Sequence, residues 1–275
     1  MTVVMVERTY PLRRRSLAIS RFSRRRIVLV SLLGGLFVAA CSPSENTPAA
    51  PVTVFAAASL TDALGEIATV YERTSGQPVR LSFAASGAVA RQIQAGAPAD
   101  VVMLADAVWM DRLQAADRLA PGTRSDLLGN TLVVIAPSDA PVDADPLGAL
   151  AVRRGELVIG DPESVPAGAY ARAWLQTSGR WDSLEARIVT TADVRAVRTF
   201  VQRGEAALGI VYRSDAIGAA GVRIVVEPPE AEQPTIVYPV AATRGAAGNA
   251  QSFLAFLTGP EARRIFIAHG FRTRS

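Results

Sequence analysis

The sequence predicts an α/β protein built as two lobes. From Val52 onward, short apolar runs alternate with segments of helical period, and turn residues separate them. This alternation is typical of α/β units with mainly parallel strands. The length from Val52 to the end, about 225 residues, allows two lobes of roughly 100 to 120 residues each. Residues 127–130 and the proline-containing residues 227–234 could carry the chain across, as a hinge of two crossing segments.

Short apolar runs bounded by turn residues predict the strands. They cover residues 53–57, 79–84, 101–104, 132–136, 157–159, 187–189, 208–211, 222–226 and 236–241. Segments with an apolar residue every three or four positions predict helices between them. These helices cover residues 61–74, 88–94, 169–177, 193–203 and 249–269. In the last of them, Gly259 should end one helix and Pro260 should start another.

The two crossings give a definite division of the chain. We expect lobe 1 to contain residues 51–129 and 237–275, and lobe 2 to contain residues 130–236. A chain that crosses twice returns to the lobe in which it started. The C-terminal helices should therefore pack on the N-terminal lobe.

The distribution of charge argues against a nucleic-acid partner. All 29 basic residues are arginine, and eight of them lie in residues 1–40 with only one of the 25 acidic residues. The rest of the chain therefore has 21 basic and 24 acidic residues, a net charge of −3. A nucleic-acid partner requires a basic patch on the folded part. One Cys and one His also exclude an intramolecular disulfide and a Cys/His zinc site.

The first 40 residues have the features of an export signal. Three arginines at 24–26 precede about fourteen mostly apolar residues, which is short for a membrane span of ~20 residues. Small residues then precede Cys41, and this pattern resembles the lipobox of bacterial lipoproteins, in which the Cys is lipidated. The alternative is an ordinary signal peptide with Cys41 near the cleavage point by chance.

The residues after the signal predict a tether. Ser42–Ala50 is small, polar and contains proline, so residues 41–50 should be a lipidated Cys and a flexible linker. We therefore expect a membrane-anchored lipoprotein on the periplasmic or cell-envelope side, attached through Cys41.

Four predicted strands end in loops rich in small and hydroxyl residues, and each loop leads into a helix. The loops cover residues 56–62, 83–88, 160–168 and 190–194. In an open α/β sheet, ligands bind where strands end and helix N-termini present unpaired N–H groups. Four such loops around a cleft would bind a small anion through amides and hydroxyls rather than counter-charges. Taken singly, each loop is more often a plain helix cap, because Ser, Thr and Asp are favoured there.

Several strings together resemble the periplasmic molybdate-binding proteins of ABC transporters. They are Val54–Thr61 (VFAAASLT), Ala90–Asp100 (ARQIQAGAPAD), Gly160–Gly168 (GDPESVPAG) and Leu208–Asp215 (LGIVYRSD). The likeness extends from about Val52 to Phe271, and Gly129–Asn130 and Tyr238–Val240 also fit it. The resemblance implies the two-lobe, type II periplasmic-binding-protein fold, with mixed sheets and flanking helices.

The resemblance also implies an oxyanion site between the lobes. Carried over position by position, the ligands are the hydroxyls and backbone amides of Ser59, Ser86, Ala167, Val194 and Tyr212. Molybdenum would be bound by these five residues as its oxyanion and not as a bare metal ion, and no cofactor is expected. One position departs from the pattern: family members often have a run of serines where this chain has Ala85-Ser86-Gly87. A neighbouring hydroxyl is therefore missing.

The expected function is extracytoplasmic capture of molybdate, and of tungstate, with delivery to the membrane permease of an ABC transporter. Molybdate is doubly charged and fully deprotonated near neutral pH, so a site made only of donors suits it and disfavours a protonated phosphate. Hydrogen bonds to a charged group contribute ~1.5–3 kcal/mol each, enough to offset desolvation and lobe closure. We expect a monomer without enzymatic activity.

Three alternatives stay open. A binding protein for another tetrahedral oxyanion, such as sulfate, would have the same donors in a smaller cavity. An exported serine hydrolase using Ser59 or Ser86 would need a base, yet the only histidine, His269, is in the C-terminal helix and no G-x-S-x-G motif is present. The effector domain of a regulator shares the two-lobe fold, but the export signal speaks against it.

Overall fold

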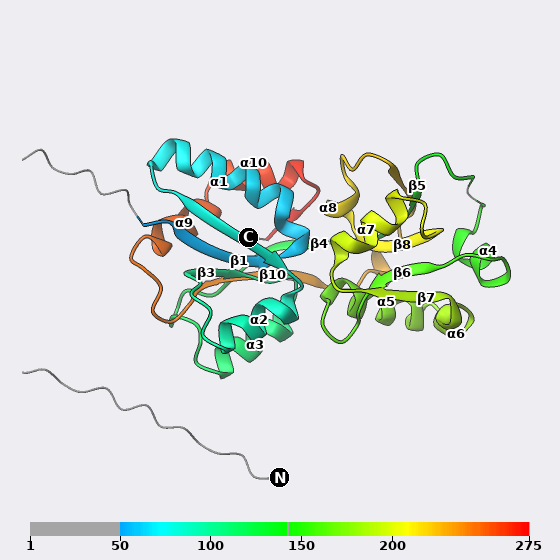
Figure 1. Ribbon diagram of the computed structural model, residues 1–275, viewed down its shortest axis with the longest axis horizontal. Helices are drawn as coiled ribbons and strands as arrows, with labels where there is room; N and C mark the ends of the chain where they lie inside the picture. Colours follow the sequence, from blue (N-terminus) through cyan, green and yellow to red (C-terminus); the bar gives the residue numbers. More distant parts are fainter. Residues whose placement is uncertain (1–49, 142, 275) are drawn as a thin grey trace, which may run out of the picture. The chain divides into compact units, whose positions relative to one another are not determined.

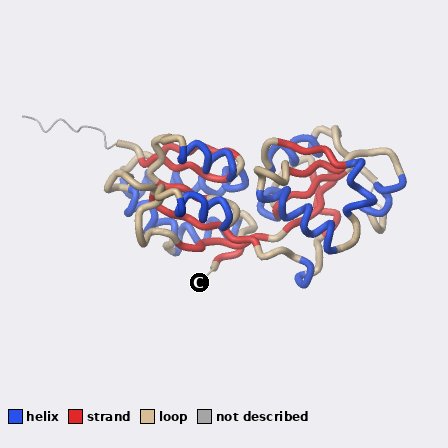
Figure 2. Tube along the Cα trace, turned by 90° about the horizontal axis from the view of Figure 1, so that it is seen from below, coloured by secondary structure: helices blue, strands red, loops and turns tan. Residues whose placement is uncertain are grey.

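The computed structural model describes residues 50–141 and 143–274 (Figure 1). The predicted signal peptide, Cys41 and nearly all of the tether lie outside these residues. In the part that is described, no helix is long and apolar enough to cross a membrane. The chain forms two mixed sheets, and helices cover both faces of each (Figure 2).

The first sheet has six strands in the order β11-β4-β10-β3-β1-β2. Its strands are β1 (Val52–Ala57), β2 (Val79–Ala84), β3 (Val101–Met103), β4 (Ser125–Asn130), β10 (Ile236–Ala242) and β11 (Arg272–Thr273). Its helices are η1 (Ala58–Leu60), α1 (Thr61–Ser75), α2 (Ser86–Gln94), α3 (Ala107–Ala115), α9 (Ala250–Leu257) and α10 (Pro260–Ala268). Figure 1 shows α1 and α10 over one face and α2 and α3 over the other. We call the part of the chain built on this sheet lobe 1.

The second sheet has five strands in the order β7-β6-β8-β5-β9, and we call the part built on it lobe 2. Its strands are β5 (Leu132–Pro137), β6 (Leu157–Gly160), β7 (Ile188–Thr191), β8 (Leu208–Tyr212) and β9 (Val222–Val226). Its helices are α4 (Pro146–Val152), α5 (Pro166–Thr177), α6 (Trp181–Leu184), η2 (Glu185–Arg187), α7 (Val194–Gln202) and α8 (Arg213–Ala216). The short η3 (Glu230–Glu232) lies in the segment between β9 and β10.

The expectation of mainly parallel strands is wrong. Parallel pairing is confined to β1 with β2 and β3, and to β6 with β7 and β8. The pairs made by β5 and β10, and the pair of β11 with β4, are antiparallel. Both β5 and β10 follow a passage of the chain from one sheet to the other, without a crossover helix within the sheet. Parallel pairing depends on such crossovers, so these strands are free to run antiparallel.

Most predicted elements are present, and the interruption at Gly259 and Pro260 is confirmed. Helix α9 ends at Leu257 and α10 begins at Pro260, whose missing N–H is unneeded in the first turn. Sequence reasoning missed β4, α3 and α4. The sequence does not show β4, because only Thr131 separates it from β5 and its Gly–Asn end has the composition of a loop.

Burial within each lobe follows the sequence periodicity. In α7, Val194, Val197 and Val201 are at most 3% exposed and lie on one face at helical spacing. Strands β5, β6 and β8 are buried along nearly their whole length, as expected for strands with helices on both faces. Packing of this kind fixes where each strand ends, and therefore where the loops that follow the strands lie.

Candidate functional site

The four loops singled out in the sequence converge on one small cavity. Its volume is about 10 Å³, roughly the space that one water molecule needs. It is lined by Ala57, Ala58, Ser59, Ala85, Ser86, Ala105, Val165, Pro166, Ala167, Asp193, Val194 and Tyr212. The lining comes from both lobes, and all five residues predicted to bind the oxyanion are part of it.

The two serines of the cavity belong to lobe 1. Ser59 lies in η1 after β1, and Ser86 begins α2 after β2; they are only 3% and 1% exposed. The Ser86 hydroxyl oxygen accepts a hydrogen bond from the backbone N–H of Ala105 at 2.9 Å, which leaves its own hydrogen free to donate. The Ser59 hydroxyl lies 3.0 Å from the hydroxyl of Tyr238.

Ala167 and Val194 contribute backbone from lobe 2. Each lies in the first turn of a helix, α5 or α7, where backbone N–H groups have no partner within the helix. Asp193 caps α7 by accepting a hydrogen bond from the N–H of Ala196 at 2.9 Å. At the start of α5, a Cβ on Gly168 would lie 1.9 Å from the carbonyl oxygen of Gly160. The glycine therefore lets α5 begin close to the end of β6.

Tyr212 ends β8 with its hydroxyl buried. That hydroxyl has no hydrogen-bond partner among the described residues, although the side chain is only 1% exposed. Burial raises its pKa well above the ordinary value, so the hydroxyl keeps its proton and can donate. A buried polar group without a protein partner is rare, and a ligand in the cavity would satisfy it.

The groups that line the cavity favour a small anion, although none of them is a positively charged side chain. No arginine lines it, and its one carboxylate, Asp193, is engaged in capping α7. The helix starts carry partial positive charge, and the hydroxyls can donate. Within residues 50–141 and 143–274 no cluster of His, Cys, Asp and Glu could hold a metal ion. The arrangement therefore suits a small anion that is bound by donors.

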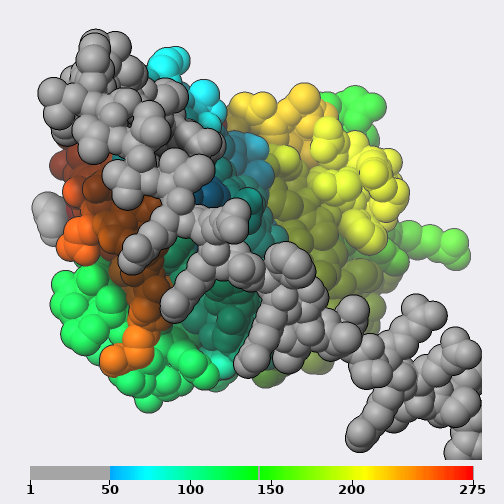
Figure 3. All heavy atoms as spheres, turned by 60° about the vertical axis from the view of Figure 1, so that its left-hand side comes forward, coloured from blue at the N-terminus to red at the C-terminus, as the bar shows by residue number. Residues whose placement is uncertain are grey.

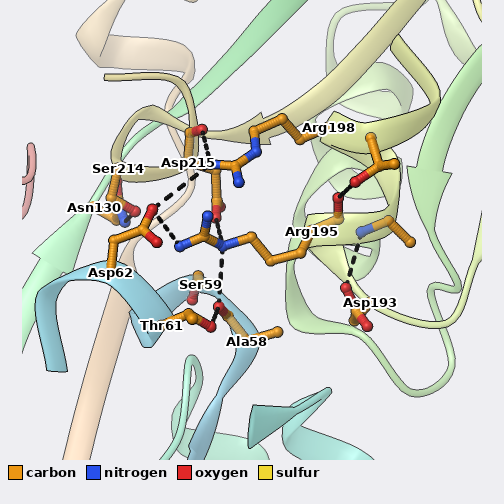
Figure 4. A network of polar contacts seen from close by, with 12 residues as sticks. Ala58, Ser59, Thr61, Asp62, Asn130, Asp193, Arg195, Arg198, Ser214 and Asp215 are labelled. Carbon is orange, nitrogen blue, oxygen red and sulfur yellow. Dashed lines mark hydrogen bonds and ion pairs between the residues drawn. The ribbon is translucent and has the colours of Figure 1, made fainter. Parts of the chain in front are cut away.

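Contacts between the lobes close this cavity. The N–H of Gly87 donates to the carbonyl oxygen of Ser164 in the other lobe at 3.1 Å. Arg195 of α7 donates from Nε to the carbonyl oxygen of Ala58 at 3.3 Å and forms an ion pair of 2.6 Å with Asp62 (Figure 4). In the space-filling view, teal atoms of lobe 1 meet yellow and olive atoms of lobe 2 directly (Figure 3).

Comparison with known proteins identifies the family of this chain. The sequence profile of the bacterial extracellular solute-binding proteins matches residues 52–272. The chain belongs to this family. It is 44% identical over 227 residues to the molybdate-binding protein ModA of Escherichia coli (strain K12), covering 80% of this chain and 88% of that protein. It is 38% identical over 232 residues to ModA of Haemophilus influenzae, covering 82% and 91%.

A solved structure supports the same assignment. The periplasmic molybdate-binding protein of Azotobacter vinelandii matches with a TM-score of 0.74 and 27% identity, covering 82% of this chain and all of that one. The predicted resemblance and the two-lobe solute-binding fold are therefore confirmed. Membership of an extracellular family places the protein outside the cytoplasm.

Sequence reasoning missed the polar residues behind the cavity of this solute-binding protein. Asn130 lies where β4 leaves lobe 1, and its amide donates to the Ser214 hydroxyl at 2.9 Å and to the Tyr238 hydroxyl at 3.3 Å. Tyr238 in turn contacts Ser59. Asn130 and Tyr238 fit the family pattern, but a strand pattern alone does not show that their polar groups meet. The signal that could have found them is that Tyr238 and Asn130 are polar residues at strand positions that become buried, where each needs a hydrogen-bond partner.

Proposed function

We propose that this protein captures molybdate, and also tungstate, between its two lobes and delivers it to the permease of an ABC transporter. The observation that carries the proposal is the small cavity to which both lobes contribute, with Ser59, Ser86, Tyr212 and the first turns of α5 and α7 in its lining. Relatives that are 44% and 38% identical are named as molybdate-binding proteins, which supports the choice of ion.

The ligand set that we propose consists of three hydroxyls and two backbone amides. Molybdate would accept hydrogen bonds from Ser59, Ser86, Ala167, Val194 and Tyr212. Each bond to a charged acceptor contributes ~1.5–3 kcal/mol, so a site without arginines can still bind tightly. In this set every group would act as a donor. Monohydrogen phosphate must also donate its own proton, which would then have no acceptor among these five groups. The site thus selects a fully deprotonated oxyanion by the direction of its hydrogen bonds.

Closure of the lobes would be the signal that the permease reads. An ion that touches both lobes only when they are closed stabilises that form by its differential contacts. Ser59 and Ser86 come from lobe 1, and Ala167, Val194 and Tyr212 come from lobe 2, so each lobe alone offers an incomplete site. We also propose that a lipid on Cys41, joined to the lobes by residues 42–50, keeps the protein beside its membrane partner.

The geometry supports binding rather than catalysis. A serine hydrolase needs a base beside its nucleophile. His269 is the C-cap of α10, and its Nε2 lies 2.9 Å from Oε2 of Glu66 on α1. Neither residue lines the cavity, so Ser59 and Ser86 have no histidine beside them.

Calorimetric titration with molybdate, tungstate, sulfate and phosphate tests the proposal. We expect saturable binding of molybdate and tungstate with micromolar or tighter affinity, and no comparable heat with phosphate. Tight binding of sulfate without molybdate would keep the oxyanion site and change the ion. Absence of binding to all four ions would contradict the proposed function.

A further inference from the structure

A charged cluster lies beside the cavity and joins the two lobes (Figure 4). It consists of Asp62 in the first turn of α1, Arg195 and Arg198 of α7, and Asp215 of α8. Arg195 lies 2.6 Å from the carboxylate of Asp62 and 3.3 Å from that of Asp215. Arg198 lies 3.7 Å from Asp62 and donates to the Asp215 carbonyl oxygen at 3.2 Å. Two positive and two negative side chains thus face one another.

None of these four side chains lines the cavity, so the cluster is separate from the proposed ligand set. The cluster nevertheless contacts two of the four loops that line the cavity, the loop before α7 and the loop after β1. Arg195 follows Val194 directly in α7, and its Nε donates to the carbonyl oxygen of Ala58, the residue before Ser59. Movement of one lobe away from the other would break these contacts together.

The ion pairs of Asp62 are the specific link between helices of the two lobes. In the described part of the chain, every ion pair that joins a helix of lobe 1 to a helix of lobe 2 uses Asp62. Arg195 is well placed for this role because it is 16% exposed and is held from behind by Asp215, which is fully buried. Partial burial opposes ionisation of Asp62, but contact with Arg195 and its charge hold the pKa of Asp62 below the ordinary value. Asp62 therefore stays charged near neutral pH.

We propose that the Asp62–Arg195 pair is a closure latch, which stabilises the closed lobes without any bound ion and so sets how tightly the ion is held. The ion pair can hold the lobes together through protein atoms alone, whereas the cavity can do so only when the ion is bound. This inference rests on the proposed function for its link to affinity, but the latch itself concerns the lobes alone. Arg195 and Asp62 are positioning residues here, because they act on the ion through lobe closure.

The latch has a quantitative consequence. When only the closed form completes the site, the apparent dissociation constant equals the intrinsic one divided by the closed fraction. Partly exposed ion pairs contribute up to about 1 kcal/mol, which corresponds to about a fivefold change in an equilibrium constant. Loss of the pair should lower the closed-to-open ratio about two- to fivefold, and the apparent affinity should fall by at most the same factor, because it follows the closed fraction.

The distance between the lobes in the absence of ion tests the latch directly. Cys41 is the only cysteine, so a Cys41→Ser background allows labels at Gln92→Cys on α2 and Gln176→Cys on α5, which are both exposed. Pulsed electron paramagnetic resonance of spin labels would give the closed and open populations. We expect a detectable closed population without ion, reduced by Asp62→Asn and by raising the salt from 0.05 to 0.5 M, and restored in the variant by saturating molybdate.

A matched control separates the latch from a general effect of charge. Asp111→Asn removes the same charge from an exposed ion pair with Arg124 inside lobe 1, and it should leave the populations unchanged. The latch is overturned if no closed population exists without ion, or if the two variants behave alike. A protein that fails to bind molybdate but still opens on Asp62→Asn would overturn the proposed function and leave the latch in place.

Discussion

The cavity and the charged cluster beside it differ in their chemical groups and in the role that we propose for each. The cavity meets a proposed doubly charged ion with hydroxyls and backbone amides and without an arginine. The cluster next to it places two arginines against two carboxylates and leaves the ion untouched. Paired charges thus join the helices of the two lobes, whereas the groups proposed to bind the ion are uncharged donors.

The separation has a physical reason. A salt bridge to the ion would attract any small anion, whereas a set of hydrogen-bond donors with fixed directions favours an ion whose oxygens all accept and which has no proton to donate. An ion pair between lobes, in contrast, needs strength and not selectivity. Each chemistry can therefore be removed by mutation without removing the other.

The largest effect should come from removing the neutral donors. The double substitution Ser59→Ala and Ser86→Ala deletes two hydrogen bonds to the ion, each contributing ~1.5–3 kcal/mol, so affinity for molybdate should fall by about 100- to 10,000-fold. Calorimetry gives the affinity, and Ser183→Ala on α6, which is exposed, is the matched control. A double variant that binds as tightly as the parent would show that the ion is held elsewhere.

An intermediate effect should come from blocking closure without touching a donor or a charge. A Cβ on Gly87 would lie 2.7 Å from the Ser164 carbonyl oxygen of the other lobe and 2.7 Å from the Trp109 ring. Overpacking of this kind costs about 1–3 kcal/mol, so Gly87→Ala should weaken molybdate binding about 5- to 150-fold.

Gly65→Ala is the control for this substitution, because no atom lies within 4 Å of the added Cβ. Thermal unfolding without ion should show that Gly87→Ala keeps its lobes folded. Unchanged affinity in Gly87→Ala would mean that the ion binds without the observed contact between the lobes.

The last effect bears on stability and not on affinity for the ion, and it comes from burying the carboxyl group of Asp215 in the cluster. Burial raises the pKa of Asp215 to about 7, against the opposing charges of Arg195 and Arg198. Between about pH 4 and 7 the folded protein then holds a proton that the unfolded chain has lost. Stability therefore falls as pH rises through this window, by up to about 1.4 kcal/mol per unit from this group.

Chemical denaturation from pH 5 to pH 8 measures this dependence. Asp215→Asn should have a flatter profile than the parent, because its side chain does not titrate. The raised pKa of Asp106, about 6, acts in the same direction in both proteins and cancels in the comparison. Equal slopes in the two proteins would show that Asp215 stays ionised throughout.

The local sequence pattern predicted where the loops of the site lie better than it predicted how the strands of the sheets pair. Ser59 and Ser86 follow apolar strands directly, and the two-lobe architecture followed from alternation and family motifs. The antiparallel pairing of β5 and β10 could not be predicted, because pairing direction depends on how the chain passes between sheets. The Asp62–Arg195 contact was invisible for the same reason: its partners are far apart in the sequence, and each resembles an ordinary exposed helix charge.

A crystal structure with molybdate, using the anomalous scattering of molybdenum, tests the central claim most directly. We expect one molybdenum peak inside the cavity, with oxygens within hydrogen-bond distance of the hydroxyls of Ser59, Ser86 and Tyr212 and of the amides of Ala167 and Val194. The lobes should be closed and Arg195 should still contact Asp62. A peak outside the cavity, or an arginine in direct contact with the ion, would contradict this claim.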